Sequence, residues 1–298
     1  MKIFDAHCDT ASELLNKGEK LFENTLHIDF KRLNSYTDFT QVFAVFISPD
    51  HYTRPMDRAK EIITNFCNEA SACNITICQS YTDLLSVKSG TRAILSLEGG
   101  EPIKTMDDLH LLHSLGIRMI APTWNHSNQL ASGIDCETDT GLTQLGREII
   151  REMDRLGIIL DVSHLSEKSF WDASEITTRP ICASHSNLRS VINHRRNLTD
   201  EQFLRIKSSG GVVGINLYPP FFGDNISMLK NHIDAFLSLG GEDNIGLGCD
   251  FDGVDFLPSG VTGVADLEKI IAGLNYPMDI LEKFTHKNFF RLIQAHNC

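Results

Sequence analysis

Six ionisable side chains in this sequence stand at the ends of short apolar runs. They are three histidines and three carboxylates: His7, Asp9, Glu98, His164, His185 and Asp250. Neutral imidazoles and carboxylates are ligands of zinc and similar divalent ions, at about 2.0–2.2 Å. In His7-Cys8-Asp9 the two ligand types are two residues apart, a spacing that places both side chains on one face of a β-strand. The residue types therefore predict a metal site.

Each of these residues, taken alone, also fits an ordinary structural role. A strand-end histidine can be a capping or core residue, Glu98 could bind the loop amides of Gly99-Gly100, and Asp250 could form a turn. The prediction depends on all six falling at strand ends, because the C-terminal strand ends of a barrel meet at one mouth. Five candidate ligands are more than one catalytic metal needs, and they suit two ions about 3.5–4 Å apart.

Eight buried runs are the predicted strands that position these side chains. They cover residues 3–9, 42–47, 93–98, 119–123, 158–164, 181–185, 212–216 and 245–250. Helical periodicity separates most of them, as in residues 142–156, which end at Gly157. Thr199-Asp200-Glu201-Gln202 is typical of a capping box that opens a helix. Strands that alternate with helices predict a parallel sheet, and eight repeats predict an α/β fold closed into a (β/α)₈ TIM barrel of the metal-dependent hydrolase type.

An open doubly wound sheet is the alternative fold. No Gly-x-Gly-x-x-Gly or Walker sequence follows any of the runs, so the usual nucleotide chemistry of that fold has no support. We expect a single barrel domain over residues 1–298, completed by helices over residues 267–274 and 278–295. Residues 18–39 fit the repeat poorly and are expected to form an insertion after the first strand.

Composition narrows the expected partners and location. The net charge is −12 and no run of Lys or Arg stands out, which disfavours nucleic acid and anionic membranes as partners. No stretch of 18 apolar residues, signal peptide or hydrophobic C-terminal tail is visible, so we expect a cytoplasmic protein.

The eight cysteines are expected to be free thiols. Cys8, Cys182 and Cys249 lie at odd separations from the candidate ligands and should face the helix layer.

Motifs along nearly the whole chain resemble the membrane (renal) dipeptidase family of the amidohydrolase superfamily. In order they are Asp5-Ala6-His7-Cys8-Asp9, His27-Ile28-Asp29, Leu97-Glu98-Gly99-Gly100, Gly141-Leu142-Thr143, Asp161-Val162-Ser163-His164, Ser184-His185-Ser186, Arg195-Arg196-Asn197 and Gly248-Cys249-Asp250-Phe251-Asp252-Gly253. Their combination and order are far more specific than His-x-Asp alone. The chain resembles a bacterial-type cytoplasmic member, because the secretory signal, disulfides and lipid-anchor tail of vertebrate members do not appear in it.

The resemblance implies which residues bind metal. His7 and Asp9 would bind one divalent ion, and zinc is the expected metal. His164 and His185 would bind a second ion, and Glu98 would bridge the two. Many superfamily relatives use a carboxylated lysine from the fourth strand as the bridge, and residues 119–123 contain no lysine.

The resemblance also implies a substrate and a mechanism. Arg196 would bind the free C-terminal carboxylate of a dipeptide, for which its planar fork is suited, and Asp250 would be the acid–base residue. A hydroxide that bridges the metals would attack the peptide bond, and a C-terminal D-residue could be tolerated.

Vertebrate members place a substrate-contacting histidine directly after a threonine that follows strand four. Here Trp124-Asn125 intervenes, so His126 takes that catalytic role only if the loop is reshaped. The resemblance further suggests a homodimer.

Two other functions stay open from the sequence. A different amidohydrolase reaction, such as lactone, cyclic amide or organophosphate hydrolysis, needs the same metal site, although Arg196 favours a substrate that carries a carboxylate. A catalytically silent barrel that only binds metal or ligand is the second alternative. Loss of a ligand or of Asp250 would mark such a protein, and all six residues are present.

Overall fold

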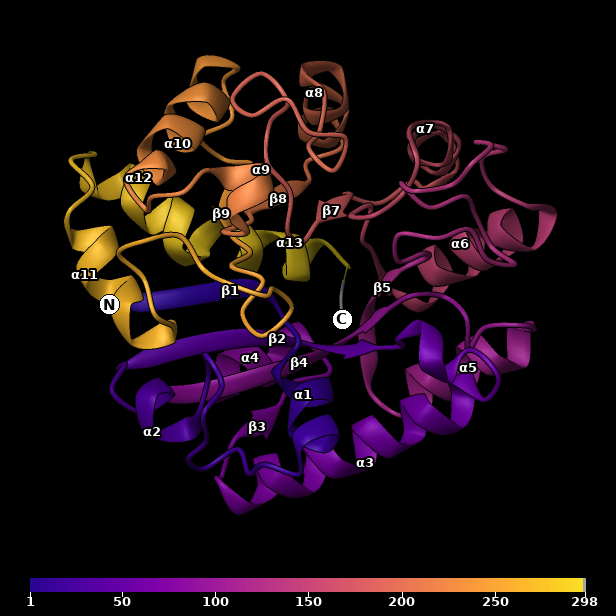
Figure 1. The fold of residues 1–298 in the computed structure, drawn as a ribbon, viewed down its shortest axis with the longest axis horizontal. Helices are drawn as coiled ribbons and strands as arrows, with labels where there is room; N and C mark the ends of the chain where they lie inside the picture. Colours follow the sequence, from indigo (N-terminus) through magenta and orange to yellow (C-terminus); the bar gives the residue numbers. More distant parts are fainter. Residues whose placement is uncertain (297–298) are drawn as a thin grey trace.

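The strands form one parallel ring with the helices outside it (Figure 1). The structure, a computed structural model, describes residues 1–296. The barrel strands are β1 (Lys2–Cys8), β2 (Asp38–Phe46), β4 (Gly90–Glu98), β5 (Ile117–Ala121), β6 (Ile159–Leu160), β7 (Cys182–Ala183), β8 (Val212–Ile215) and β9 (Ile245–Leu247). Their order is β6-β5-β4-β2-β1-β9-β8-β7, and a bridge between Asp161 and Cys182 joins the two ends. The predicted (β/α)₈ barrel is confirmed, and β3 (Thr76–Ile77) pairs with β4 outside the ring.

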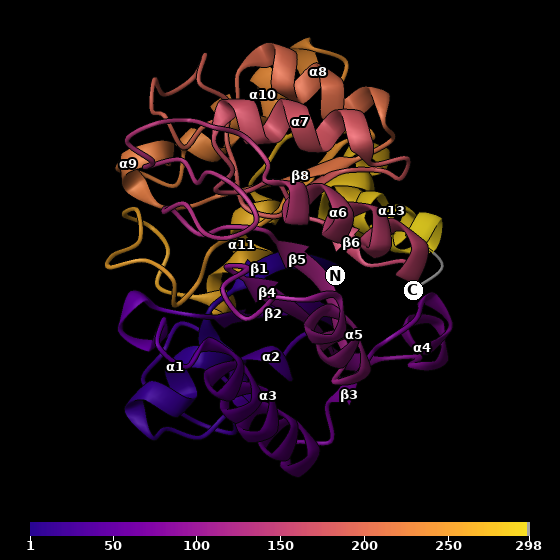
Figure 2. The same ribbon diagram turned by 90° about the vertical axis from the view of Figure 1, so that its right-hand side faces the viewer.

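The helices surround the strands and differ widely in length. They are α1 (Thr10–Lys17), α2 (Phe30–Leu33), α3 (Pro55–Ala72), α4 (Tyr81–Ser86), α5 (Met106–Ser114), α6 (Gln144–Leu156), α7 (Glu167–Ile176), α8 (Asp200–Ser208), α9 (Pro219–Phe222), α10 (Met228–Ser238), α11 (Leu267–Ala272), α12 (Met278–Glu282) and α13 (Asn288–His296). Figure 2 shows α3 on one side of the strands and α8 and α10 on the other. None of the helices in residues 1–296 combines the length and the apolar character that crossing a bilayer requires.

The end of α6 and the start of α8 fall where their sequence signals predict. α6 begins after Thr143, whose hydroxyl accepts a hydrogen bond from the Gly146 N–H, and ends at Gly157 with φ 77°. α8 begins after Thr199, and the Gln202 side chain accepts from the Thr199 N–H to complete the capping box. These contacts satisfy backbone groups that a helix end leaves without partners.

The strands β6 and β7 are shorter than the predicted ranges 158–164 and 181–185. The chain leaves the strand direction at Asp161, because its carboxylate accepts the backbone N–H groups of Ser163 at 3.0 Å and Ser184 at 2.9 Å. A buried side chain thus satisfies donors that a longer strand would have paired with its neighbour.

The other differences concern element boundaries. The helix predicted over residues 278–295 consists of α12, a π-helical turn (Lys283–Lys287) and α13. β2 begins at Asp38, so the end of the stretch predicted as an insertion is strand. That residues 18–39 are an insertion, and that the chain is a single domain, stay predictions.

The inside of the ring holds a small apolar cluster, separate from the larger cluster under the outer helices. Its strand residues are Phe4, Ala6, Val42, Ile94, Met119, Ile159, Cys182 and Val212. Helix α13 covers it, and Phe289 stacks on Phe4 with ring centroids 4.9 Å apart.

Cys8 and Cys249 pack in the outer cluster, as predicted. The prediction for Cys182 is wrong, because this residue packs in the inner cluster. Strand β7 ends at Ala183, so regular alternation of side chains does not extend to His185. The described cysteines are free thiols, and Cys298 lies outside the described residues.

Strand β1 contains a bulge just before the candidate ligands. Asp5 lies opposite Gln41 of β2, whereas Cys8 lies opposite Phe43, so β1 carries one more residue than β2 in this interval. Consequently Phe4 and Ala6 face the inner cluster, yet Cys8 faces the outer one. A bulge changes the direction of the side chains that follow it. This bulge turns His7 and Asp9 to the inside of the ring.

The N-terminal strand ends carry a buried ion pair. Arg92 of β4 and Asp38 of β2 are 3% and 2% exposed, and the Arg92 guanidinium contacts both carboxylate oxygens of Asp38. Arg92 also donates to Thr40 Oγ1 at 3.2 Å and to the Val87 carbonyl at 2.6 Å, and Lys2 Nζ lies 3.3 Å from Asp38. This end of the barrel therefore matches buried charges of opposite sign within the protein.

Candidate metal centre

The six ionisable residues predicted at strand ends all reach the C-terminal mouth of the barrel. Glu98 ends β4, His7 is the last residue but one of β1, and the others lie in the turns that follow β1, β6, β7 and β9. Their side chains are buried, with 1–8% of each residue exposed. The closed ring of strands thus brings together groups that are far apart in the sequence.

Glu98 lies in the middle of the cluster and faces it with both carboxylate oxygens. Its Oε2 is 3.4 Å from His7 Nε2. Its Oε1 is 2.8 Å from His164 Nε2 and 3.7 Å from His185 Nε2. One carboxylate therefore separates two groups of donors and contacts both.

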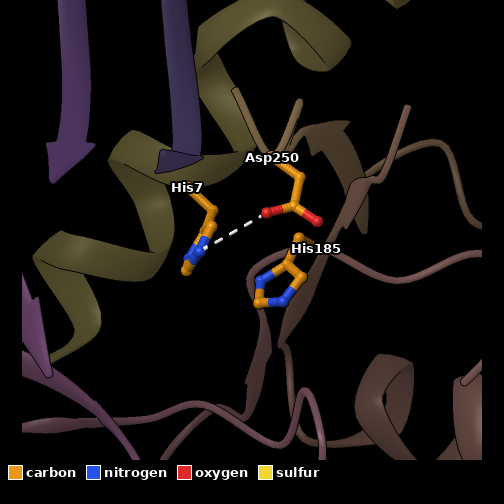
Figure 3. A group of neighbouring side chains, drawn as sticks. All are labelled: His7, His185 and Asp250. Carbon is orange, nitrogen blue, oxygen red and sulfur yellow. Dashed lines mark ion pairs between the residues drawn. The ribbon is translucent and has the colours of Figure 1, made fainter. Parts of the chain in front are cut away.

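His7, His185 and Asp250 come together from three different elements (Figure 3). His7 Nε2 lies 3.7 Å from Asp250 Oδ1 and 3.2 Å from Asp9 Oδ2, and the rings of His7 and His185 have centroids 3.9 Å apart. Three sets of three donors have all their ligand atoms within 4.8 Å of one another. They are His7–Asp9–Glu98, Glu98–His164–His185 and His7–His185–Asp250.

The two histidines that follow β6 and β7 are oriented by hydrogen bonds to Nδ1. Asn125 Oδ1 lies 2.7 Å from His164 Nδ1, and a carbonyl oxygen can only accept, so this Nδ1 carries the proton. The Ser184 hydroxyl donates to Asp161 and lies 2.7 Å from His185 Nδ1, so it accepts from that Nδ1. In both rings Nε2 therefore presents a lone pair to the mouth, the tautomer that a metal ligand needs.

Asp250 is held by a neighbour that sequence reasoning did not find. Asn216, which follows β8 and is fully buried, donates its side-chain amide to Asp250 Oδ2 at 2.8 Å. The side-chain oxygen Oδ1 of Asn216 in turn accepts from the Tyr218 N–H at 2.6 Å. Asp250 is thereby left with Oδ1 directed at the cluster. No motif in the sequence marks Asn216, Asn125 or Ser184 as a partner of these residues.

Three residues at the mouth have left-handed backbones although none is glycine. The φ angles are 69° at His164, 62° at Asp250 and 67° at Asp252. The Asp252 carboxylate accepts from the Thr10 hydroxyl at 2.5 Å and from the His27 N–H at 2.6 Å, which fixes this turn. Left-handed conformations cost L-residues about 1–2 kcal/mol each, so surrounding contacts must stabilise them.

Burial keeps two of the imidazoles neutral. It lowers the pKa of His164 to about 4, and the nearby Arg196 charge acts in the same direction. Burial also lowers the pKa of His185 well below its usual range, with the charge of His7 as the next cause. Neutral imidazole is the form that binds a metal ion.

The carboxylates of the cluster compete for positive charge. Burial raises the pKa of Asp9 to about 8, and the charge of Glu98 adds to this shift. Burial opposes the ionisation of Glu98 too, but the positive charge of His7 favours it, and the pKa of Glu98 lies well below its usual range. Burial likewise disfavours a charge on His7, yet Glu98 and Asp9 raise its pKa well above the usual range. The cluster thus attracts a cation.

The donor set fits a bound divalent cation. The Nε2 atoms of His164 and His185 lie 2.8 Å apart, and because both present lone pairs, a cation between the donors would remove their repulsion. The buried Oδ1 of Asp9 has no hydrogen-bond partner within residues 1–296, and unpartnered buried polar atoms are costly. Three imidazoles with carboxylates on either side are the ligand types that zinc takes.

Arg196 approaches the same cluster from the loop after β7. It is 8% exposed, its Nη2 lies 3.0 Å from His164 Nε2, and its guanidinium lies over the Phe221 ring at 5.6 Å. Its predicted place at the mouth is thus where the structure puts it. A buried guanidinium beside the cluster can bind an anionic group of a ligand.

His126 is the predicted site residue that the structure does not bring to the cluster. It is exposed on the loop after β5, and its ring packs edge-on against Trp124 with centroids 5.5 Å apart. Trp124, rather than His126, lines the cavity of about 450 Å³ above the cluster. Two residues between Thr123 and His126 direct the histidine outward.

Comparison with known proteins gives a consistent result. The sequence profile of the membrane dipeptidase family, peptidase family M19, matches residues 1–297. The structure is similar to that of a dipeptidase described as a metallopeptidase of family M19, with 28% sequence identity and a TM-score of 0.93 over 100% of this chain and 99% of that chain. It is equally similar to a metallopeptidase from Rhodobacter sphaeroides in complex with a phosphinate mimic of the dipeptide L-Ala-D-Ala, with 28% identity, a TM-score of 0.93 and 99% of each chain covered.

A curated relative agrees with these structures. An uncharacterized dipeptidase from Schizosaccharomyces pombe is 31% identical over 303 residues, which cover 90% of this chain and 72% of that protein. The family expected from the sequence motifs is confirmed. The chain belongs to the membrane dipeptidase family, peptidase family M19.

Proposed function

We propose that this protein is a metal-dependent dipeptidase that hydrolyses dipeptides with a free C-terminal carboxylate. The observation that carries the proposal is the position of Glu98, with one oxygen toward His7 and the other toward His164 and His185. Membership of the family and the complex of the Rhodobacter sphaeroides relative with a dipeptide mimic support the same substrate class.

In this proposal the cluster holds two divalent ions, with Zn²⁺ as the metal. His7 and Asp9 would bind one ion and His164 and His185 the other, with Glu98 shared between them. When bound, such a pair lowers the pKa of a water molecule toward about 7 and polarises the scissile carbonyl. The short distances among the five side chains support a shared site.

Asp250 acts as the acid–base residue in the proposed reaction. Asn216 holds Oδ2, so Oδ1 is available on the side of His7. Through this oxygen Asp250 would take the proton released by the attacking water and deliver it to the leaving amine nitrogen. Burial raises the pKa of Asp250, which suits a group that must hold a proton between these two steps.

Arg196 determines the length of the substrate in this proposal. A bidentate guanidinium–carboxylate pair would hold the C-terminus beside the cluster and leave room for two residues. Because the carboxylate is held and not the C-terminal side chain, a D-residue at that position would be accepted.

A role for His126 requires the loop 124–126 to turn inward when substrate binds. The homodimer stays a prediction, which sedimentation of the purified protein tests.

The test compares a free dipeptide with its C-terminal amide. Wild type should strongly prefer the free dipeptide, and Arg196→Met should lower kcat/KM for it by roughly ten- to over a hundredfold, since losing a charge-assisted pair costs about 1.5–3 kcal/mol. The metal content should not change. Arg195→Met is the matched control, because the Arg195 side chain is 56% exposed and forms its ion pair with Asp135, which is not a residue of the cluster. Equal kcat/KM of wild type for dipeptide and amide would contradict the carboxylate anchor.

A further inference from the structure

The cavity above the metal cluster has one aromatic wall. Phe46 and Trp124 both line it, with ring centroids 5.3 Å apart and ring planes at 60°. Both rings are half-buried, so each keeps part of its apolar surface open to the cavity. Most other residues of the lining are acidic, among them Glu13 and Asp252. The aromatic pair is therefore the principal apolar surface that the cavity offers.

Strand register places this wall next to Glu98. Phe46 is the last residue of β2 and lies directly opposite Glu98 at the end of β4. Ala121 of β5 lies opposite Glu98 on its other side, and Trp124 follows shortly after. The Trp124 ring is 6.3 Å from that of His164. A peptide bond held at Glu98 would thus have aromatic rings beside it.

The order of the strands places Phe46, one half of the wall, across the mouth from Arg196. Strand β2, which carries Phe46, and strand β7, which precedes the Arg196 loop, are separated by β4, β5 and β6 in one direction. In the other direction they are separated by β1, β9 and β8, so the two strands are diametrically opposite in the ring. A dipeptide with its carboxylate at Arg196 and its peptide bond over the cluster would extend its N-terminal residue toward Phe46, against which Trp124 packs.

We infer that Phe46 and Trp124 form the subsite for the side chain of the N-terminal residue, and that this protein prefers dipeptides in which that side chain is large and apolar. The inference rests on the proposed dipeptidase function and adds the substrate class to it. An apolar side chain on the wall removes aromatic and aliphatic surface from water together. The ammonium group of the same residue is directed to the acidic part of the lining, where carboxylates stabilise its charge.

The test measures hydrolysis of Leu-Gly and Ser-Gly by the zinc-loaded protein. Wild type should show a kcat/KM for Leu-Gly roughly ten- to a hundredfold above that for Ser-Gly, the range that apolar pockets give for such differences. Phe46→Ser should reduce this ratio to within about threefold of unity, mainly by raising KM for Leu-Gly, while Phe46→Leu should retain most of it. Zinc content, measured separately, should be unchanged in both variants.

The matched control is Phe22→Ser, because Phe22 is a 52%-exposed phenylalanine outside the cavity and its loss should leave the ratio as in wild type. Equal kcat/KM of wild type for the two dipeptides would overturn the inference and leave the proposed function intact. The same holds if Phe46→Ser and Trp124→Ser lower both substrates by the same factor. Failure of the zinc-loaded wild type to hydrolyse either dipeptide would instead overturn the proposed function.

Discussion

Strand β4 carries a buried charge near each end, and the two charges have very different surroundings. Near its start, Arg92 forms an ion pair with Asp38 and donates to Thr40 and the Val87 carbonyl. At its end, Glu98 lies among three imidazoles, with Asp9 and Asp250 close by. The first end balances its charges inside the protein, whereas the second gathers carboxylates around donors that need a cation.

This difference shows that buried charged groups can be balanced within the protein at one end of a strand and left to bind a ligand at the other. A buried pair of opposite charges contributes little net stability, but removing one partner is costly. A cluster of like charges is unfavourable until a cation enters it, so its stability depends on the bound metal. The two ends should therefore respond differently to changes in metal and to single substitutions.

Removal of the metal should have the largest effect, and only at the mouth. Chelation is expected to abolish dipeptide hydrolysis and to lower Tm, because metal at 100 times its Kd adds about 2.7 kcal/mol to the stability of the folded state. Addition of Zn²⁺ should restore both. Elemental analysis at saturation should give two ions per chain. Full activity with one ion per chain would contradict the shared, two-metal site.

Asp250→Asn should have the next largest effect. The amide cannot take up the proton, so kcat should fall by about 10²- to 10⁴-fold, while the zinc content stays at the wild-type level. His164→Ala provides the contrast, since it removes a direct ligand and should lower the zinc content itself. Near wild-type activity of Asp250→Asn would show that another group moves the proton.

Ser184→Ala tests whether the hydrogen bonds behind the ligands matter. Loss of the hydroxyl between Asp161 and His185 should weaken zinc affinity by about 10- to 100-fold, measured by competition with a chelator of known affinity. Ser186→Ala is the control, because the Ser186 hydroxyl contacts only Ser163, at 3.5 Å, among the side chains of residues 1–296. Equal affinity of the Ser184 and Ser186 variants would mean that packing alone orients His185.

Asp38→Asn should have the smallest effect on activity. It leaves the buried Arg92 charge without its main partner, and the free energy of unfolding should fall by about 3–5 kcal/mol. Zinc content and kcat/KM of the folded protein should stay as in wild type, as measured at a temperature well below Tm. A loss of metal affinity in this variant would show that the two ends of the barrel are coupled.

The sequence allowed the barrel and the six clustered residues to be predicted because both depend on local patterns. Apolar runs show where strands end, and a closed ring of parallel strands brings those ends together. The partners behind the cluster could not be found in this way. Asn216 and Asp250 are 34 residues apart, and nothing in the sequence around either indicates the hydrogen bond between them.

The outward position of His126 was also beyond a local pattern, because it depends on how Trp124 packs. The Trp124 ring lies against Phe46 with centroids 5.3 Å apart and takes the inner position of the loop. An aromatic ring that can bury apolar surface is preferred there over an imidazole. The same contact that places Trp124 in the cavity thus places His126 outside it.

The bulge in β1 has a consequence for changes in chain length. Ala6 and His7 together occupy the space opposite Val42, because Asp5 pairs with Gln41 and Cys8 with Phe43. In a regular strand, deletion of one residue would reverse the direction of every side chain on one side of the deletion. Here, deletion of Ala6 would convert the bulge into a regular ladder with Cys8 still opposite Phe43. We therefore expect the shortened chain to bind zinc through His7 and Asp9, with equilibrium dialysis as the measurement.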